Sequence, residues 1–474
     1  MTRSLPTTVG GLKAQGYVPR SVKDEVRRNL MERLRSGQTV FPGILGYEDT
    51  VFPQIVNAVL SRHDMLLLGL RGQAKTKLMR LLPTLLDPLI PTFANDDILD
   101  DPLSPRFARN QQLLADHGDD VEIRWVPREE RFHEKLATPD VTIADLIGEI
   151  DLVKHAQGRS LDDESVIHFG LIPRTNRGIF AINELPDLAP KIQVGLFNAL
   201  EERDVQIRGF PVRLPLDVMM AFTANPEDYT NRGRIVTPLK DRIGSVIRTH
   251  YPLSPIQGVE ITRQEAWLQR EDEGLRSFVP PFMLEVVEEI ARIARESPHV
   301  NQLSGVSVRM SIANAELLVS NAQRRALIHG EQDVVPRMTD LLHIVAGCRG
   351  KIELMLADDE KAEDKLITSF IGEAVKSVYS DYGDVEELEG VVEFFADRDK
   401  AIQIGDEIST ADLLKQVNDA PSLKKASVRL CVEVDMPFEE DAVLASAAEF
   451  VLETLYVQNR LSKYAYHGKT IFKR

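Results

Sequence analysis

Cysteine is nearly absent from this chain, which has only two among its 474 residues, Cys348 and Cys431. They lie far apart and belong to no CxxC or His/Cys pattern, which excludes a disulfide framework and gives no zinc site. The chain also lacks an apolar run of membrane-spanning length. Its first six residues contain no apolar signal core. These absences predict a reducing compartment, and we expect the protein in the cytoplasm with no membrane span.

Positive charge is in deficit, because 57 Lys and Arg stand against 73 Asp and Glu, for a formal net charge of −16. This balance argues against a general nucleic-acid binder, although it leaves room for a local basic pore. The excess is concentrated in residues 358–400, where fourteen acidic side chains stand against five basic ones. Such a stretch indicates a solvated surface or a charged docking face.

The hydrophobic pattern changes near Pro252 from mixed α/β to helical. Before it, residues 1–20 are expected to form an extended arm, and residues 21–35 an amphipathic helix that Ser21 caps and Gly37 ends. Residues 88–139 are rich in Pro, Asp and Asn, which predicts surface loops around one candidate strand at 121–126. Apolar runs predict buried parallel strands at 65–68, 178–182, 218–222 and 245–248. After Pro252 only helices are expected, among them 283–296, 307–325 and 442–461.

The most informative segment is residues 69–76 (GLRGQAKT), which follows the first apolar strand and precedes a helical pattern. Strand, glycine loop, Lys-Thr and helix is the order of a phosphate-binding P-loop. In such a loop backbone N–H groups and the helix N-terminus face the phosphates. Lys75 would reach the outer phosphates and Thr76 would hold magnesium. One position departs from the pattern, because Ala74 replaces the glycine before the lysine; an ordinary strand–turn–helix is the alternative.

Two further strand ends carry polar side chains. The strand at 178–182 is followed by Asn183 and Glu184, where P-loop ATPases usually have Asp and Glu. The first of these holds magnesium and the second can deprotonate the attacking water. Asn183 keeps an oxygen acceptor but loses the charge, whereas Glu184 keeps the base. The next strand ends at Asn225, whose amide can position that water; alone, Asn-Pro is a turn signal.

These segments together resemble the AAA+ ATPases, and within them the magnesium-chelatase ATPase subunit and the MoxR-type group. The resemblance covers roughly residues 38–345, and its ordered combination of segments is far more specific than any one of them. It runs through residues 145–152 (DLIGEIDL), 170–178 (GLIPRTNRG), 183–185 (NEL), 200–203 (LEER), 223–227 (TANPE) and 239–242 (LKDR).

The resemblance implies an α/β fold in which a P-loop AAA+ parallel-sheet domain is followed by an all-α lid and a mainly helical C-terminal region. It divides the chain into an N-terminal arm and helix (1–37), the AAA+ domain (38–252), the helical lid (253–350) and an acidic, mainly helical region (351–474). It also implies two projections, a helix-2 insertion at 148–170 and a hairpin at 204–214. Either is as readily a plain surface hairpin.

The resemblance assigns a role to each matching position. ATP would be bound by Gly69, Gly72, Gln73, Ala74, Lys75, Thr76 and Lys77, and Mg²⁺ by Thr76 and Asn183. The catalytic set would be Glu184 as base, Asn225 as first sensor, Arg242 as the finger offered to a neighbouring subunit, and Arg309 as the lid sensor. Delocalised guanidinium cations suit the charge on a transferring phosphoryl group, although most arginines form surface ion pairs.

The departures at Ala74 and Asn183 are compatible with slow hydrolysis, altered magnesium affinity or binding without turnover. Because the other catalytic positions are filled, we expect an active ATPase, and restoring the usual residue at either position should retain or raise hydrolysis. The expected form is a homo-oligomer, a hexameric ring, that remodels or loads a protein partner, with metal insertion among the tasks that the resemblance implies. The integrin-type metal-binding domain of such systems is missing here and would belong to a separate partner.

Two other functions compete. A nucleotide-binding scaffold with little or no hydrolysis is supported by Ala74 and Asn183. A DNA-associated AAA+ motor or activator shares this ATPase branch, but the chain has no GAFTGA-like loop or helix-turn-helix signature, and its net charge of −16 disfavours nucleic acid.

Overall fold

The computed structural model describes residues 5–150, 167–207, 213–226, 233–270, 274–355, 360–397, 399–466 and 469–474. The chain forms two compact units, Met1–His250 and Tyr251–Arg474. The division into four parts that composition and resemblance give stays a prediction. Among the described residues, no helix is both long and apolar enough to cross a membrane.

The first unit is built around a sheet of five parallel strands in the order β11-β1-β10-β7-β4. This confirms the four strands predicted from apolar runs and adds β4, which was missed. Three smaller antiparallel pairs, β2–β3, β5–β6 and β8–β9, lie outside this sheet. The bounds are β1 (Met65–Leu68), β2 (Leu89–Phe93), β3 (Ile123–Pro127), β4 (Phe132–Leu136), β5 (Gly148–Ile150), β6 (Ile167–Phe169), β7 (Gly178–Asn183), β8 (Asp204–Gln206), β9 (Arg213–Pro215), β10 (Val218–Ala224) and β11 (Ser245–Arg248).

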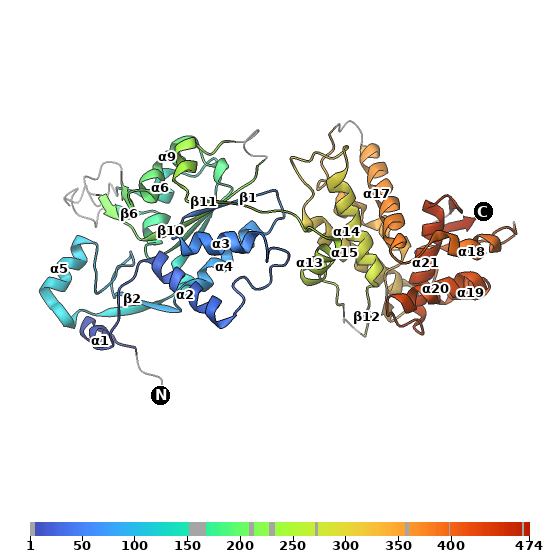
Figure 1. Ribbon diagram of the computed structural model, residues 1–474, viewed down its shortest axis with the longest axis horizontal. Helices are drawn as coiled ribbons and strands as arrows, with labels where there is room; N and C mark the ends of the chain where they lie inside the picture. The colour runs from blue at the N-terminus through green and yellow to red at the C-terminus, as the bar shows by residue number, and fades with distance from the viewer. Residues whose placement is uncertain are drawn as a thin grey trace. The chain divides into compact units, whose positions relative to one another are not determined.

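Alternate residues of the central strands enter two separate cores, one on each face of the sheet. Met65, Ile179 and Ala221 belong to the core that includes helix residues Val26, Ile55 and Leu78. Leu66, Phe180 and Phe222 belong to the core on the opposite face. Figure 1 shows the blue helices α2, α3 and α4 together beside the sheet. The helices of this unit are α1 (Val9–Ala14), α2 (Val22–Ser36), α3 (Val51–Leu60), α4 (Lys75–Leu81), α5 (Ala108–His117), α6 (Ile143–Leu146), α8 (Leu171–Arg174), α9 (Pro190–Gly195), α10 (Phe197–Leu200) and α12 (Thr237–Arg242).

The N-terminal segment differs in part from its prediction. Helix α2 begins after Ser21, which accepts a hydrogen bond from Asp24 N, and ends at left-handed Gly37, as expected. Residues 1–20, however, are not simply extended: they contain α1, whose first residue donates its N–H to Val121 O. Thr8 caps this helix and supplies the start signal that was overlooked.

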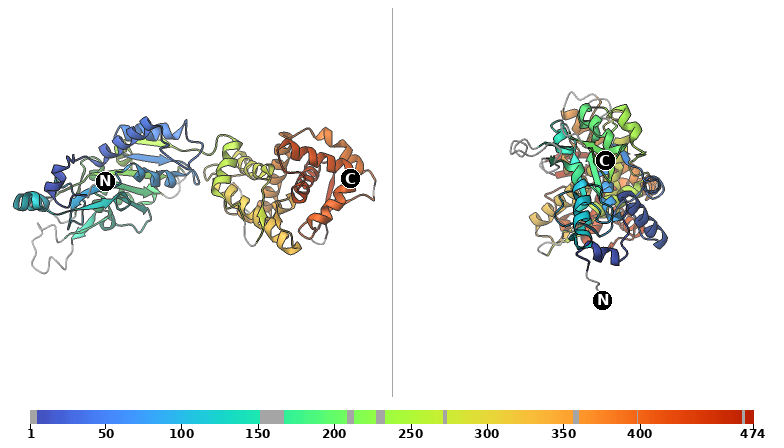
Figure 2. Two further views of the ribbon diagram at one scale, coloured as in Figure 1. Left: turned by 90° about the horizontal axis from the view of Figure 1, so that it is seen from below. Right: turned by 90° about the vertical axis from the view of Figure 1, so that its left-hand side faces the viewer.

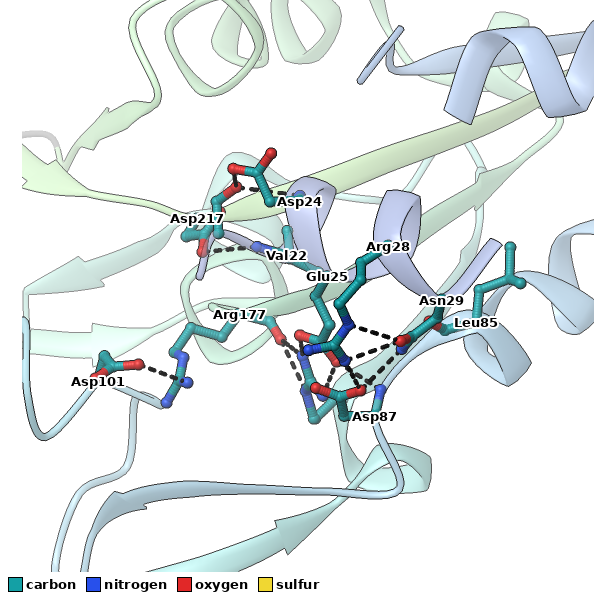
Figure 3. A network of polar contacts seen from close by, with 12 residues as sticks. Val22, Asp24, Glu25, Arg28, Asn29, Leu85, Asp87, Asp101, Arg177 and Asp217 are labelled. Carbon is teal, nitrogen blue, oxygen red and sulfur yellow. Dashed lines mark hydrogen bonds and ion pairs between the residues drawn. The ribbon is translucent and has the colours of Figure 1, made fainter. Parts of the chain in front are cut away.

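Helix α2 is joined to the sheet by a buried ion-pair network, part of which is labelled in Figure 3. Both terminal nitrogens of Arg131, a fully buried side chain, donate to the Glu25 carboxylate at 2.8 and 2.7 Å. Arg131 also donates to the carbonyl of Arg177, whose own guanidinium pairs with Asp101 at 2.9 Å. Because Arg131 precedes β4 and Arg177 precedes β7, this network fixes α2 against the beginnings of both strands.

The second unit is mainly helical, as the yellow-to-red chain in the left view of Figure 2 shows. The expectation of helices alone is wrong, however, because the chain end adds an antiparallel sheet in the order β14-β16-β15. Its principal helices are α13 (Pro255–Glu265), α14 (Pro281–Glu296), α15 (Val308–His329), α16 (Val345–Cys348), α17 (Glu360–Ser380), α18 (Glu389–Phe394), α19 (Thr410–Asn418), α20 (Pro421–Glu433) and α21 (Asp441–Val457). Its strands are β12 (Arg276–Ser277), β13 (Asp333–Val334), β14 (Ile402–Ile404), β15 (Ser462–Tyr466) and β16 (Lys469–Lys473).

Candidate active site

The loop between β1 and α4 turns through two residues with positive φ. Gly72 has φ of 75° and Ala74 has φ of 53°, in the left-handed region. Glycine adopts this conformation freely, whereas an L-residue with a side chain loses about 1–2 kcal/mol there. Position 74 is therefore one that favours glycine, and Ala74 occupies it with some backbone strain.

Lys75 is the first residue of α4, and its side chain folds back over the loop. Its Nζ donates to Gly69 O at 2.5 Å and to Leu70 O at 2.8 Å, and the residue is only 6% exposed. The ammonium therefore lies within the loop that would receive phosphate. The next lysine differs, because Lys77 is exposed and its Nζ donates to Gly43 O at 2.9 Å.

The loop is held in place by the end of β11 and by an aromatic residue before α3. Thr249 Oγ1 donates to Gln73 Oε1 at 2.7 Å, and Tyr47 OH donates to Gln73 O at 2.9 Å. Gly69 has no room for a side chain, because a Cβ there would lie 1.9 Å from Thr249 Oγ1. The loop backbone is thus fixed from two sides before any ligand arrives.

The predicted residues from three strands meet at one edge of the sheet. The carboxyl ends of β1, β10 and β7 are adjacent, and Gly69 N donates to Ala224 O at 3.1 Å, which places the following Asn225 beside the loop. Thr76 Oγ1 donates to Asn183 Oδ1 at 3.1 Å. Glu184, next to Asn183, has left-handed backbone angles of 55° and 52°. Strained non-glycine residues of this kind gather at functional sites.

Thr223 on β10 joins the two strand ends and was not among the predicted site residues. Its hydroxyl accepts the Glu184 N–H at 3.0 Å and donates to Asn183 Oδ1 at 3.3 Å. The TAN segment was noticed in the sequence for Asn225 alone. The sequence could have indicated Thr223, because it lies two residues before Asn225 and its strand was expected beside the one that ends at Asn183 and Glu184.

A second overlooked residue, Glu134, comes from the missed strand β4. Its Oε1 accepts a hydrogen bond from Asn183 Nδ2, and its Oε2 accepts from Arg80 Nε at 2.7 Å. This bond raises the pKa of Arg80 above its ordinary value. Beside Glu134, burial lowers the pKa of His133 and the charge of Arg174 lowers it further, so the imidazole is neutral at pH 7.

The two predicted arginines lie elsewhere. Arg242 ends α12, where its Nε pairs with Glu201 Oε2 at 2.5 Å and its guanidinium lies 4.8 Å from the centre of the Phe197 ring. It precedes β11 by three residues. Because β11 runs parallel to β1, its first residue lies at the amino ends of the strands, whereas the phosphate loop follows the carboxyl end of β1. Arg309 belongs to the second unit, where it is exposed in the first turn of α15.

The donor set suits a nucleotide with a hard divalent cation. Mg²⁺ prefers oxygen ligands and keeps several waters beside the phosphates, so few protein ligands are needed, and a hydroxyl and an amide oxygen are of the right kind. Thr76, the residue after Lys75, and Asn183 present these two oxygens within hydrogen-bond distance of each other. Among the described residues, no group of three His, Cys, Asp or Glu side chains is arranged to hold a metal ion by itself.

The predicted projections are described in part. Strands β5 and β6 at the base of the 148–170 insertion pair antiparallel, as do β8 and β9 of the 204–214 hairpin. The interior of the insertion, residues 151–166, and the hairpin tip with Gly209 and Phe210 lie outside the described residues.

A central β1 that leads into a phosphate loop, within a parallel sheet of order β11-β1-β10-β7-β4, defines the class: the first unit has the AAA+ ATPase fold. No protein-family model matches the chain. The uncharacterized protein YeaC of Bacillus subtilis (strain 168) is 28% identical over 259 residues, which are 51% of this chain and 74% of that protein. The hydrogenase transcriptional regulatory protein HoxA of Cupriavidus necator is 34% identical over 93 residues, 19% of each chain.

Two solved structures are similar at lower identity. One is a complex between subunits BchI and BchD of magnesium chelatase, where 69% of this chain and 99% of that chain align with 19% identity and a TM-score of 0.34. The other is NtrX from Brucella abortus, with 82% and 72% aligned, 14% identity and a TM-score of 0.39. Both TM-scores are below 0.5, so the assignment of the fold rests on the strand order and the loop.

Proposed function

We propose that this protein binds ATP with Mg²⁺ and hydrolyses it at the edge where β1, β10 and β7 end. The observation that carries the proposal is the convergence of Lys75, Thr76, Asn183 and Glu184 at that edge, joined by the Thr76–Asn183 and Thr223–Glu184 hydrogen bonds. A phosphate-binding lysine, two magnesium-binding oxygens and a carboxylate base are the parts that phosphoryl transfer to water needs.

Each residue has a distinct task in this proposal. Lys75 exchanges the carbonyls of Gly69 and Leu70 for phosphate oxygens, while the backbone N–H groups of the loop bind the remaining charge. Thr76 and Asn183 hold the magnesium ion, which supplies positive charge to the phosphate oxygens when bound. Glu184 accepts the proton of the attacking water, and Asn225 orients that water from the neighbouring strand.

We further propose an oligomeric ring, with a hexamer as the expected size. Arg242 lies near the sheet edge opposite its own phosphate loop, which supports its delivery to the nucleotide of a neighbouring subunit. Arg309, exposed on α15, is proposed as the lid sensor. By analogy with the magnesium-chelatase and MoxR-type systems, the work of hydrolysis would remodel or load a protein partner, such as a separate protein with an integrin-type metal-binding domain.

One alternative has a specific observation in its favour. The left-handed backbone of Ala74 and the missing charge at Asn183 support a nucleotide-binding scaffold that turns over little ATP. A DNA-associated motor has less support: HoxA is named as a transcriptional regulator, but it matches over 93 residues only, and the net charge of this chain is −16. Turnover separates the scaffold from the ATPase, and stimulation by DNA would revive the motor.

Calorimetric titration with ATP and Mg²⁺ tests the binding site. The wild type is expected to bind, and Lys75→Ala is expected to lose binding because the phosphate charge is no longer matched. Lys191→Ala, which removes an exposed lysine on α9, serves as the matched control and should bind as the wild type does. Undiminished affinity in Lys75→Ala would show that the nucleotide, if bound, lies elsewhere.

A further inference from the structure

The side chain that stands in for the missing aspartate at position 183 is itself held by a carboxylate. Asn183 Nδ2 donates to Glu134 Oε1, while Asn183 Oδ1 accepts from Thr76 Oγ1 at 3.1 Å and Thr223 Oγ1 at 3.3 Å. These three partners of the amide therefore agree on one orientation. The amide oxygen faces the side where Thr76 lies, and the amide nitrogen faces away from it.

The strand register explains why Glu134 can do this. Glu134 on β4 pairs with Ala181 on β7, two residues before Asn183, so both side chains are on the same face of the sheet. Thr76 and Arg80 are four residues apart on α4, and therefore share the helix face above these strands. The four side chains form one row, from Thr76 through Asn183 and Glu134 to Arg80.

Arg80 fixes the outer end of this row. Its Nε and one terminal nitrogen donate to the two oxygens of Glu134 at 2.7 and 3.1 Å, a two-point contact that holds the carboxylate plane. The side chain of Glu134 is 20% exposed and that of Arg80 is 63% exposed. Solvent therefore screens the cation more than the carboxylate, which lies nearer to Asn183.

We propose that Glu134 is a positioning residue for the magnesium ligand Asn183, an inference that rests on the proposed ATP and Mg²⁺ site. A carboxylate behind a ligand fixes the direction of that ligand and raises its basicity. Here it selects the amide oxygen for the metal side and draws the amide dipole so that the oxygen is more negative. The negative charge that an aspartate at position 183 would carry is supplied instead by Glu134, which lies behind Asn183 and not in contact with the metal.

This contact reverses the expectation for Asn183→Asp. The residue pattern alone predicts that an aspartate would retain or raise hydrolysis. In the structure that aspartate would place a second carboxylate against Glu134, and two carboxylates at hydrogen-bond distance disfavour double ionisation. Asn183→Asp is therefore expected to bind Mg²⁺ well only when it is combined with Glu134→Gln, whose amide nitrogen can donate to the new carboxylate.

The test measures ATP affinity at increasing Mg²⁺ concentrations and in EDTA, by calorimetry, for wild type, Glu134→Gln, Asn183→Asp and the double variant. Glu134→Gln should raise about tenfold the Mg²⁺ concentration at which half of the Mg²⁺-dependent gain in ATP affinity is reached. This is the usual scale for loss of a ligand-orienting partner. Metal-free ATP affinity should not change, because Lys75 is intact. In the Asn183→Asp background, the same substitution should lower the required Mg²⁺ concentration. Glu130→Gln, an exposed carboxylate before β4, is the control for charge and should match wild type.

The decisive result is that Glu134→Gln raises the Mg²⁺ requirement of the wild type but lowers that of Asn183→Asp. Damage to the fold would change the Mg²⁺ requirement in the same direction in both backgrounds. A Glu134→Gln variant with the wild-type Mg²⁺ requirement, or with equal losses in the wild-type and Asn183→Asp backgrounds, would overturn the positioning role and leave the proposed ATP site intact. Absence of ATP binding in the wild type would instead overturn the proposed function, and this inference with it.

Discussion

Ala74 stands where the phosphate loop turns into α4, and its backbone is left-handed with φ of 53°. Its side chain therefore costs backbone strain that glycine would not have. Glu184 shares this backbone region with φ of 55°, and its carboxylate is the base that we propose. Strain at two of the site positions is consistent with a site whose geometry is imposed by the surrounding sheet.

Ala74→Gly should raise the thermal midpoint of the protein. Relief of left-handed strain is worth about 1–2 kcal/mol, against about 0.5–1 kcal/mol for the extra freedom of glycine in the unfolded chain. The same substitution at Ala58, inside α3, should lower the midpoint, because Ala58 has no left-handed strain to relieve and glycine has a lower helix propensity than alanine. Differential scanning calorimetry on both variants checks the pair, and a lower midpoint in both would contradict the strain at Ala74.

At the scale of elements, the sequence located the strands that run through the centre of the sheet. β1, β7 and β10 are nearly continuous apolar runs, which buried parallel strands require. β4 was missed because its residues, FHEKL, are only partly buried at the sheet edge and follow a polar stretch. Glu134 was missed with it, since its role depends on a register between strands about 50 residues apart, which no local pattern encodes.

The buried ion pair between α2 and the sheet should be a major determinant of the stability of the first unit. Arg131 is fully buried, and Glu25→Ala would leave its charge without the bidentate carboxylate. The expected loss is about 3–5 kcal/mol, as for other broken buried pairs. Asp119→Asn, which breaks an exposed pair with Lys13, should cost no more than about 1 kcal/mol.

Chemical denaturation followed by a signal from the first unit would compare these two variants. Trp125 on β3 is a suitable fluorophore because its Nε1 donates to Pro6 O within that unit. Equal, small losses in Glu25→Ala and Asp119→Asn would mean that α2 is held by its apolar face alone.

At the scale of the whole molecule, the two compact units divide the proposed work. The first unit contains all the residues proposed to bind phosphate and Mg²⁺, whereas Arg309 belongs to the second unit. The proposed chemistry lies at the carboxyl ends of β1, β10 and β7, and Arg242 lies near the amino ends of the strands of the same sheet. One chain therefore presents a site at one edge and a candidate finger at the other, which is the arrangement a ring of identical subunits can use.

Mixing two inactive variants tests this arrangement. Arg242→Ala chains retain an intact phosphate loop, and Lys75→Ala chains retain an intact finger, so co-assembled mixtures should recover part of the hydrolysis that each lacks. Phosphate release by the mixture, with co-assembly shown by light scattering, is the measurement. No recovery in mixed assemblies, or full specific activity in a monomer, would contradict a finger supplied by the neighbour.

The most direct test of the central claim is phosphate release from ATP and Mg²⁺ by wild type and Glu184→Gln at several protein concentrations. Glu184→Gln should still bind ATP, while its turnover falls by about two orders of magnitude or more, because the general base is lost. Wild-type turnover that vanishes at every concentration, or turnover that Glu184→Gln leaves unchanged, would contradict an ATPase whose base is Glu184.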